Sequence, residues 1–147
     1  MQQSLKTIIK ELLIEWQNKP LPDLYYRDSS AINLDNMYNI LAIIGPRRAW
    51  KTYYMYQLIH ELIENFWIQK NDILFLDFEN YKLVELQTND VWEILNIFYE
   101  IHWKYPKYLF FDEIHTLEHR WNVLRTFHND WYNIIISWSS SKLLLNE

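Results

Sequence analysis

The chain has 147 residues, half of them hydrophobic, with a net charge of −5 and no cysteine. One domain with a sizeable core is therefore expected, and the acidic balance argues against a general polyanion binder, just as the missing cysteine excludes disulfides and thiolate metal sites. The sequence shows no signal peptide and no apolar run near the ~18 residues of a membrane span, so we predict a cytoplasmic protein without membrane contact.

The expected secondary structure alternates between helices and strands. Apolar residues at helical spacing predict helices at residues 5–16, 51–66, 91–101 and 121–127. Asn89 and Asp90 are expected to cap the third of these helices. Continuous apolar runs predict buried strands at residues 40–44, 73–78, 108–111 and 133–137. This alternation predicts an α/β fold in which a parallel sheet is flanked by helices.

A phosphate-binding loop is predicted between the first strand and the helix that follows it. Residues 45–52 match the pattern G-x-x-x-x-G-K-[ST], except that Trp50 stands at the second glycine position. In such a loop Lys51 would reach the β- and γ-phosphates and Thr52 would offer its hydroxyl to Mg²⁺. The alternative is that both residues merely begin a helix after a turn. The predicted nucleotide-binding residues are Gly45, Pro46, Arg47, Arg48, Ala49, Trp50, Lys51 and Thr52.

A second motif places two carboxylates, Asp112 and Glu113, directly after the apolar run at 108–111. Open α/β sheets bind ligands at the carboxyl ends of their strands. Asp112 would therefore hold Mg²⁺, and Glu113 would polarise the attacking water. On their own the two residues could simply be acids at a strand end, but the loop upstream favours the catalytic interpretation.

Weaker candidates lie after the other strands. The serine-rich segment after the last strand could hold a polar sensor in Ser139 or Ser140, and a solvated turn is the alternative. Asp77 and Glu79 point to the same edge of the sheet, where a catalytic or partner-coupling role stays open. The histidines show no metal-ligand spacing, so we expect surface positions for them.

Three segments, at 43–52, 109–114 and 135–144, together resemble the N-terminal ATPase domain of a prokaryotic AAA-type ATPase family. These archaeal and bacterial proteins often carry a further C-terminal region of unknown function. The resemblance implies that residues 45–52 bind ATP and that Asp112 and Glu113 are the Mg²⁺ and hydrolysis pair. It also implies that Ser139 or Ser140 is the sensor, and that family members continue into a C-terminal domain with an arginine-containing segment.

Tryptophan is in surplus and glycine is scarce. Eight tryptophans accompany one glycine, where average usage of about 7% would give roughly ten glycines. Members of the family that this chain resembles carry glycine at the positions of Trp50 and Trp138. Trp67 and Trp103 follow predicted helices, and Trp131 lies in a predicted turn, where the backbone favours a left-handed residue. We hypothesise that all five are glycine in the natural protein because its source reads UGA as glycine; UGG codons at these positions would contradict this.

The sequence therefore predicts an N-terminal helix and linker over 1–30 and an incomplete AAA-type core over 31–147. The expected function is Mg-ATP hydrolysis coupled to an unknown partner, if position 50 is glycine. Expected partners are ATP, a C-terminal domain of the same chain and further copies; the acidic charge gives nucleic acid no support. If Trp50 is real, its indole obstructs close approach of phosphate, and a positive φ there would be strained. The alternative is then a nucleotide-independent interaction module.

Overall fold

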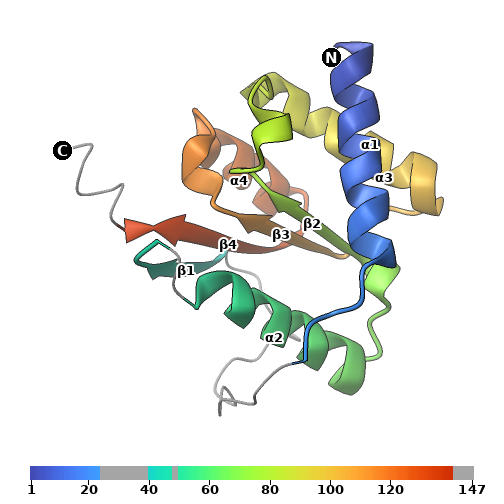
Figure 1. Cartoon of the computed structure of the whole chain (residues 1–147), viewed down its shortest axis with the longest axis vertical. Helices are drawn as coiled ribbons and strands as arrows, with labels where there is room; N and C mark the ends of the chain where they lie inside the picture. The colour runs from blue at the N-terminus through green and yellow to red at the C-terminus, as the bar shows by residue number, and fades with distance from the viewer. Residues whose placement is uncertain (24–39, 48–49, 141–147) are drawn as a thin grey trace.

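The computed structural model describes residues 1–23, 40–47 and 50–140. Within these ranges four parallel strands form one sheet in the order β1-β4-β3-β2 (Figure 1). The strands are β1 (Leu41–Gly45), β2 (Ile73–Asp77), β3 (Tyr108–Asp112) and β4 (Asn133–Ser139). The helices are α1 (Gln3–Asn18), α2 (Lys51–Asn65), α3 (Val91–His102) and α4 (Arg120–Asn129). The predicted α/β fold, a parallel sheet flanked by helices, is confirmed.

Helices cover both faces of the sheet because successive side chains of each strand point to opposite faces. α2 packs on one face, against Phe75 and Phe110 (Figure 1). α1, α3 and α4 cover the other face, against Leu74 and Leu109. No α-helix in the described part of the chain combines the length and apolarity that crossing a membrane requires. Most of the residues predicted to face inward from the helices are buried, and the others are half-buried. The buried ones include Leu5, Ile9, Leu13, Met55, Leu58, Ile59, Leu62, Val91, Ile94 and Phe98.

β1 differs from the fully buried strand that its apolar sequence predicts. Ile44 is 55% exposed. Among the described strands β1 pairs with β4 alone, with Leu41 opposite Ile135. A continuous apolar run does not distinguish a central strand from a strand at the edge of the ladder, and here the topology decides.

Two element ends also differ from the prediction. β4 continues through Ser139, which pairs with Gly45 of β1. Ser139 is therefore fully buried in a strand, not part of a solvated turn. Asp90 precedes α3, but its carboxylate accepts a hydrogen bond from the Gln87 N–H at 3.0 Å and does not cap that helix. It instead closes the short 3₁₀ turn over Thr88–Asp90.

Three of the tryptophans predicted to occupy glycine positions have left-handed backbone. The φ angles are 60° at Trp67, 60° at Trp103 and 69° at Trp131. Each follows the end of an α-helix, and the three side chains are 94%, 79% and 80% exposed, respectively. An L-residue in this region costs roughly 1–2 kcal/mol, which glycine avoids. The backbone therefore supports the glycine hypothesis at these three positions.

Trp50 and Trp138 do not share this backbone. Trp50 has φ −71° and ψ −1°, in the right-handed region, so the strain that a positive φ would cause does not arise at this position. Trp138 is a buried residue of β4 that stacks on Trp121 at a centroid distance of 5.5 Å, with the Arg120 guanidinium 4.2 Å from its ring. Its buried indole N–H finds no acceptor among the residues described. At these two positions the glycine hypothesis rests on the family resemblance.

Candidate functional site

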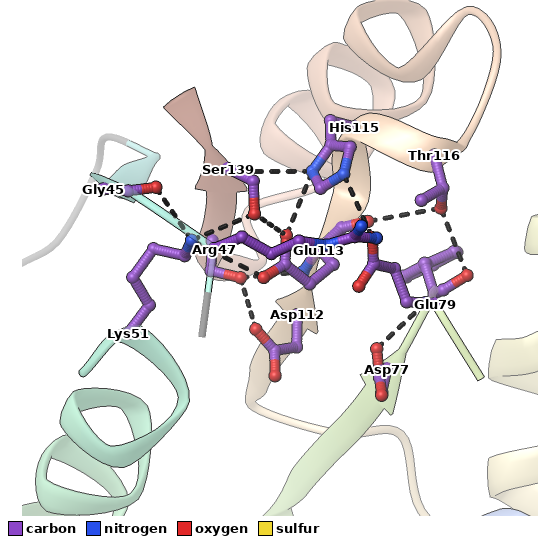
Figure 2. A network of polar contacts seen from close by, with 12 residues as sticks. Gly45, Arg47, Lys51, Asp77, Glu79, Asp112, Glu113, His115, Thr116 and Ser139 are labelled. Carbon is purple, nitrogen blue, oxygen red and sulfur yellow. Dashed lines mark hydrogen bonds and ion pairs between the residues drawn. The ribbon is translucent and has the colours of Figure 1, made fainter. Parts of the chain in front are cut away.

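A cavity of about 410 Å³ lies where the carboxyl ends of β2 and β3 meet the N-terminus of α2. This volume is within the range of small-molecule sites, about 300–1,000 Å³. Figure 2 shows the side chains of this edge converging from separate parts of the chain. The lining residues are Arg47, Lys51, Thr52, Asp77, Glu79, Asp112 and Glu113. The structure thus brings both sequence motifs to one cavity.

Lys51, the first residue of α2, is only 2% exposed although it carries a charge. Its ammonium donates hydrogen bonds to the carbonyls of Gly45 at 2.9 Å and Pro46 at 3.0 Å, and to Ser139 Oγ at 3.0 Å. It also lies 3.6 Å from Glu113 Oε1 (Figure 2). These acceptors offset the cost of burying the charge. The Lys51 ammonium is therefore bound by carbonyls of its own loop and lies close to the Glu113 carboxylate.

Thr52 and Asp112 form the second contact between the motifs. The Thr52 hydroxyl donates to Asp112 Oδ2 at 2.7 Å, and the Ser137 hydroxyl donates to Asp112 Oδ1. Burial raises the pKa of Asp112, and the negative charge of the neighbouring Glu113 raises it further. Hydrogen bonds from Ser137 and Thr52 and the charge of Lys51 oppose this rise. Two adjacent oxygen ligands of this kind suit Mg²⁺, which binds through one or two protein groups beside phosphate and water.

Glu113 has a left-handed backbone, with φ 54° and ψ 46°. Its N–H donates to Ser137 Oγ at 2.7 Å, and Thr116 Oγ1 donates to its carbonyl at 3.2 Å. Its carboxylate is 12% exposed, and Oε2 accepts a hydrogen bond from Ser139 Oγ at 2.7 Å. Such a conformation in a non-glycine residue costs roughly 1–3 kcal/mol and is concentrated at functional sites. The strained turn directs this carboxylate towards Lys51 and Ser139.

His115, which sequence reasoning assigned to the surface, is also part of the site. Its side chain is 4% exposed, so that prediction is wrong. Nδ1 lies 3.1 Å from Glu113 Oε2 and Nε2 lies 3.5 Å from Glu79 Oε1 (Figure 2). Glu79 Oε1 also accepts a hydrogen bond from Arg47 at 2.5 Å. The only signal in the sequence was the position of His115 two residues after Glu113.

Carboxylates outnumber cations at this edge of the sheet. Asp77, Glu79, Asp112 and Glu113 face Arg47 and Lys51. Burial raises the pKa of Asp77, its hydrogen bond from the Glu79 N–H opposes the rise, and the three neighbouring carboxylates add to it. One ligand atom each of Glu79, Glu113 and His115 also lies within 4.8 Å of the others. Arg47 contacts Glu79 and Lys51 contacts Glu113, so these two cations partly neutralise the charge of the two glutamates.

The remaining predicted residues belong to the loop or follow β4. Arg48 and Ala49 lie outside the described residues, and Ser140 is half-buried beyond β4. Pro46 contributes its carbonyl to Lys51. Trp50 is 47% exposed and packs edge-on against Tyr54 at a centroid distance of 5.7 Å. A Cβ placed on Gly45 would lie 3.7 Å from the Trp50 ring, so the indole lies over the start of the loop.

Comparison with known proteins points to one family. A family model described as an AAA domain matches residues 37–147. An uncharacterized protein of Methanocaldococcus jannaschii is 35% identical over 108 residues, which are 74% of this chain and 23% of the relative. The chain thus spans about a quarter of the length of the curated relative it matches. No solved structure matches. The chain belongs to the AAA domain family.

Proposed function

We propose that this domain binds ATP at the carboxyl edge of its sheet and hydrolyses it with Mg²⁺. The observation that carries the proposal is a buried Lys51 in contact with Ser139 and Glu113, beside the hydrogen-bonded pair Thr52 and Asp112. These residues come from β1–α2, β3 and β4 and meet around one cavity. Phosphoryl transfer needs positioning and charge stabilisation, which this set can supply.

Lys51 would bind the β- and γ-phosphates. Its ammonium now has three oxygen acceptors at 2.9–3.0 Å, all of them within its loop or on β4. Phosphate oxygens would replace the two loop carbonyls, because anionic acceptors form stronger hydrogen bonds with an ammonium than neutral carbonyls do. The N-terminus of α2 would add backbone N–H groups and a favourable dipole to the same phosphates.

Thr52 Oγ1 and Asp112 Oδ2 are the oxygens that would hold Mg²⁺. Their separation of 2.7 Å means that they already converge, and the raised pKa of Asp112 reflects a buried carboxylate that a cation would stabilise. When bound, Mg²⁺ would neutralise charge on the phosphates. Ser137 donates to Asp112 and so fixes the orientation of that carboxylate.

Glu113 would orient the attacking water and accept its proton. The carboxylate is now engaged by Ser139 and Lys51, at 2.7 and 3.6 Å. Once Lys51 moves to phosphate, Glu113 loses its contact with that ammonium, and its carboxylate can accept a hydrogen bond from the water instead. Ser139 keeps its hydroxyl beside both groups and would act as the polar sensor; Ser140 is the alternative at the end of β4.

Binding and hydrolysis are tested separately. Calorimetry of Mg-ATP binding would use the chain and its Trp50→Gly variant, and phosphate release would report hydrolysis. We expect Glu113→Gln to lower kcat about 100-fold or more while it keeps ATP affinity. Lys51→Ala should lose binding, and Glu85→Gln, an exposed glutamate outside the cavity, should change neither. Hydrolysis that survives Glu113→Gln would contradict the assignment.

Trp50 favours a second candidate, a nucleotide-independent interaction module. The indole lies over Gly45, where phosphate must approach the backbone closely. If the indole excludes the nucleotide, the chain will bind no ATP, whereas Trp50→Gly restores binding. Absence of binding and hydrolysis in the Trp50→Gly variant would favour the module. Equal, tight binding by both forms would instead show that the indole does not obstruct the loop.

The wider assembly is also a proposal. We infer a core over residues 31–147 with the N-terminal helix and linker over 1–30, although α1 contacts β2 and α3 and contributes Leu5 and Ile9 to the same core cluster as the sheet. We also propose coupling of hydrolysis to a partner, a C-terminal domain, association of copies and a cytoplasmic location; of these, only the further domain has support from a match that covers 23% of the relative. Partner identity is best approached with the full-length protein.

A further inference from the structure

His115 contacts three chain segments at once. Its imidazole lies in the short turn Ile114–Thr116 that follows β3. Nδ1 is 3.1 Å from Glu113 Oε2 and 3.3 Å from the backbone nitrogen of Ser139, and Nε2 is 3.5 Å from Glu79 Oε1. Only 4% of the side chain is exposed to solvent. The ring therefore connects the ends of β2, β3 and β4.

The two neighbours of Nδ1 require opposite protonation states of this nitrogen. To bond Glu113, a carboxylate acceptor, Nδ1 must carry a proton; to bond the Ser139 N–H, it must present its lone pair. One ring nitrogen cannot do both. His115 thus has two arrangements. With a proton on Nδ1, whether or not Nε2 is also protonated, it holds Glu113 Oε2; with Nδ1 unprotonated, it accepts from the Ser139 backbone and repels that oxygen at 3.1 Å.

Glu79 selects between these arrangements. In a neutral imidazole, the hydrogen bond made by one nitrogen decides which nitrogen carries the proton. Glu79 does not hydrogen-bond Nε2, but its negative charge 3.5 Å away favours a proton on that nitrogen of the neutral ring and leaves the lone pair on Nδ1 for Ser139. Arg47 contacts the same Glu79 oxygen at 2.5 Å and weakens that preference by partly neutralising the carboxylate. Among the described residues, the charged groups that contact the ring or its two carboxylate neighbours include Arg47 on Glu79 and Lys51 on Glu113.

We propose that His115 is a positioning residue for Glu113, with its tautomer set by Glu79. When Nε2 carries the proton, Glu113 is released from the ring and is free to turn towards the water that attacks phosphate. When Nδ1 carries it, Glu113 Oε2 stays bound to the imidazole. The kinetic consequence rests on the hydrolysis proposed above; the tautomer and its dependence on Glu79 do not.

The tautomer is measured without ATP. In the full chain labelled with ¹⁵N-histidine, long-range nitrogen–proton correlation spectra distinguish protonation at Nε2 from protonation at Nδ1. We expect His115 to be mainly Nε2-protonated, and Glu79→Gln to lower that population severalfold. Glu85→Gln, an exposed glutamate, should leave it unchanged. A His115 tautomer population that Glu79→Gln leaves unchanged would overturn the proposal, whether or not the chain hydrolyses ATP.

Kinetics test the second half of the proposal. In the Trp50→Gly chain we expect His115→Ala to lower kcat about tenfold and to change KM for ATP less than twofold. His115→Asn, whose amide can donate or accept near the Nδ1 position, should recover most of the rate. His60→Ala, a histidine of α2 paired with Glu64, is the matched control and should stay within twofold. A raised KM with unchanged kcat would contradict positioning, whereas no hydrolysis in any variant would refute the proposed function alone.

Discussion

Replacing Trp67, Trp103 and Trp131 together by glycine should stabilise the protein. Each residue has φ between 60° and 69°, a conformation that costs an L-residue roughly 1–2 kcal/mol. Glycine loses about 0.5–1 kcal/mol of this gain through the greater entropy of its unfolded chain. Little packing is lost, because the side chains are at least 79% exposed. The net gain is about 0.5–1 kcal/mol a site, or roughly 2 kcal/mol for the three, if independent sites add.

Urea and thermal unfolding followed by far-ultraviolet circular dichroism measure this gain. For a domain of this size roughly 2 kcal/mol corresponds to a Tm increase of about 4–8 °C. Alanine at the same three positions keeps the Cβ and should give no such gain. Trp121→Gly, on an exposed site inside α4, should destabilise the chain. A triple glycine variant no more stable than the parent, or matched by triple alanine, would refute the reasoning.

Three further changes test other parts of the structure by urea unfolding. Because burial raises the pKa of Asp112, the folded state holds that proton more tightly than the unfolded chain, and stability should fall as pH rises from the ordinary aspartate pKa through the raised one. Asp112→Asn should therefore flatten this dependence and raise stability at pH 7 without Mg²⁺; an unchanged slope would contradict it. Arg47→Ala should cost less than about 1 kcal/mol, because the Arg47 side chain is 52% exposed despite its short contact with Glu79. Phe110→Ala should cost about 3–5 kcal/mol, since Phe110 is fully buried in β3, and a cost below about 1 kcal/mol would show that the core is not packed as described.

Local patterns predicted the elements and part of the backbone. Strands and helices followed from apolar periodicity, because burial of one face is what selects those elements. The left-handed residues Trp67 and Trp103 were predictable since a helix end favours such a residue whatever its side chain. The exposed face of β1 was not predictable, because Ile44 has the sequence of a buried strand residue and only the strand order places it at the edge of the described ladder.

The site was predictable only where its residues belong to a motif. Lys51 and Asp112 stand at the ends of elements that the sequence defines, and topology brings those ends together. His115 was missed because its role depends on the left-handed turn at Glu113 and on Ser139 and Glu79, which belong to other strand ends. Such a contact among residues distant in sequence leaves no local pattern.

The pairing of β1 with β4 has a consequence for the order of folding. β2 and β3 are consecutive strands that pair directly. Leu41 of β1 can pair only after Ile135 of β4 has been synthesised. Synthesis at about 5–20 residues per second places these two residues roughly 5–20 s apart on the ribosome. Throughout that interval the Lys51 ammonium has neither Ser139 nor a finished sheet edge around it. The edge that carries the candidate site is therefore completed last, after β2 and β3 can already pair.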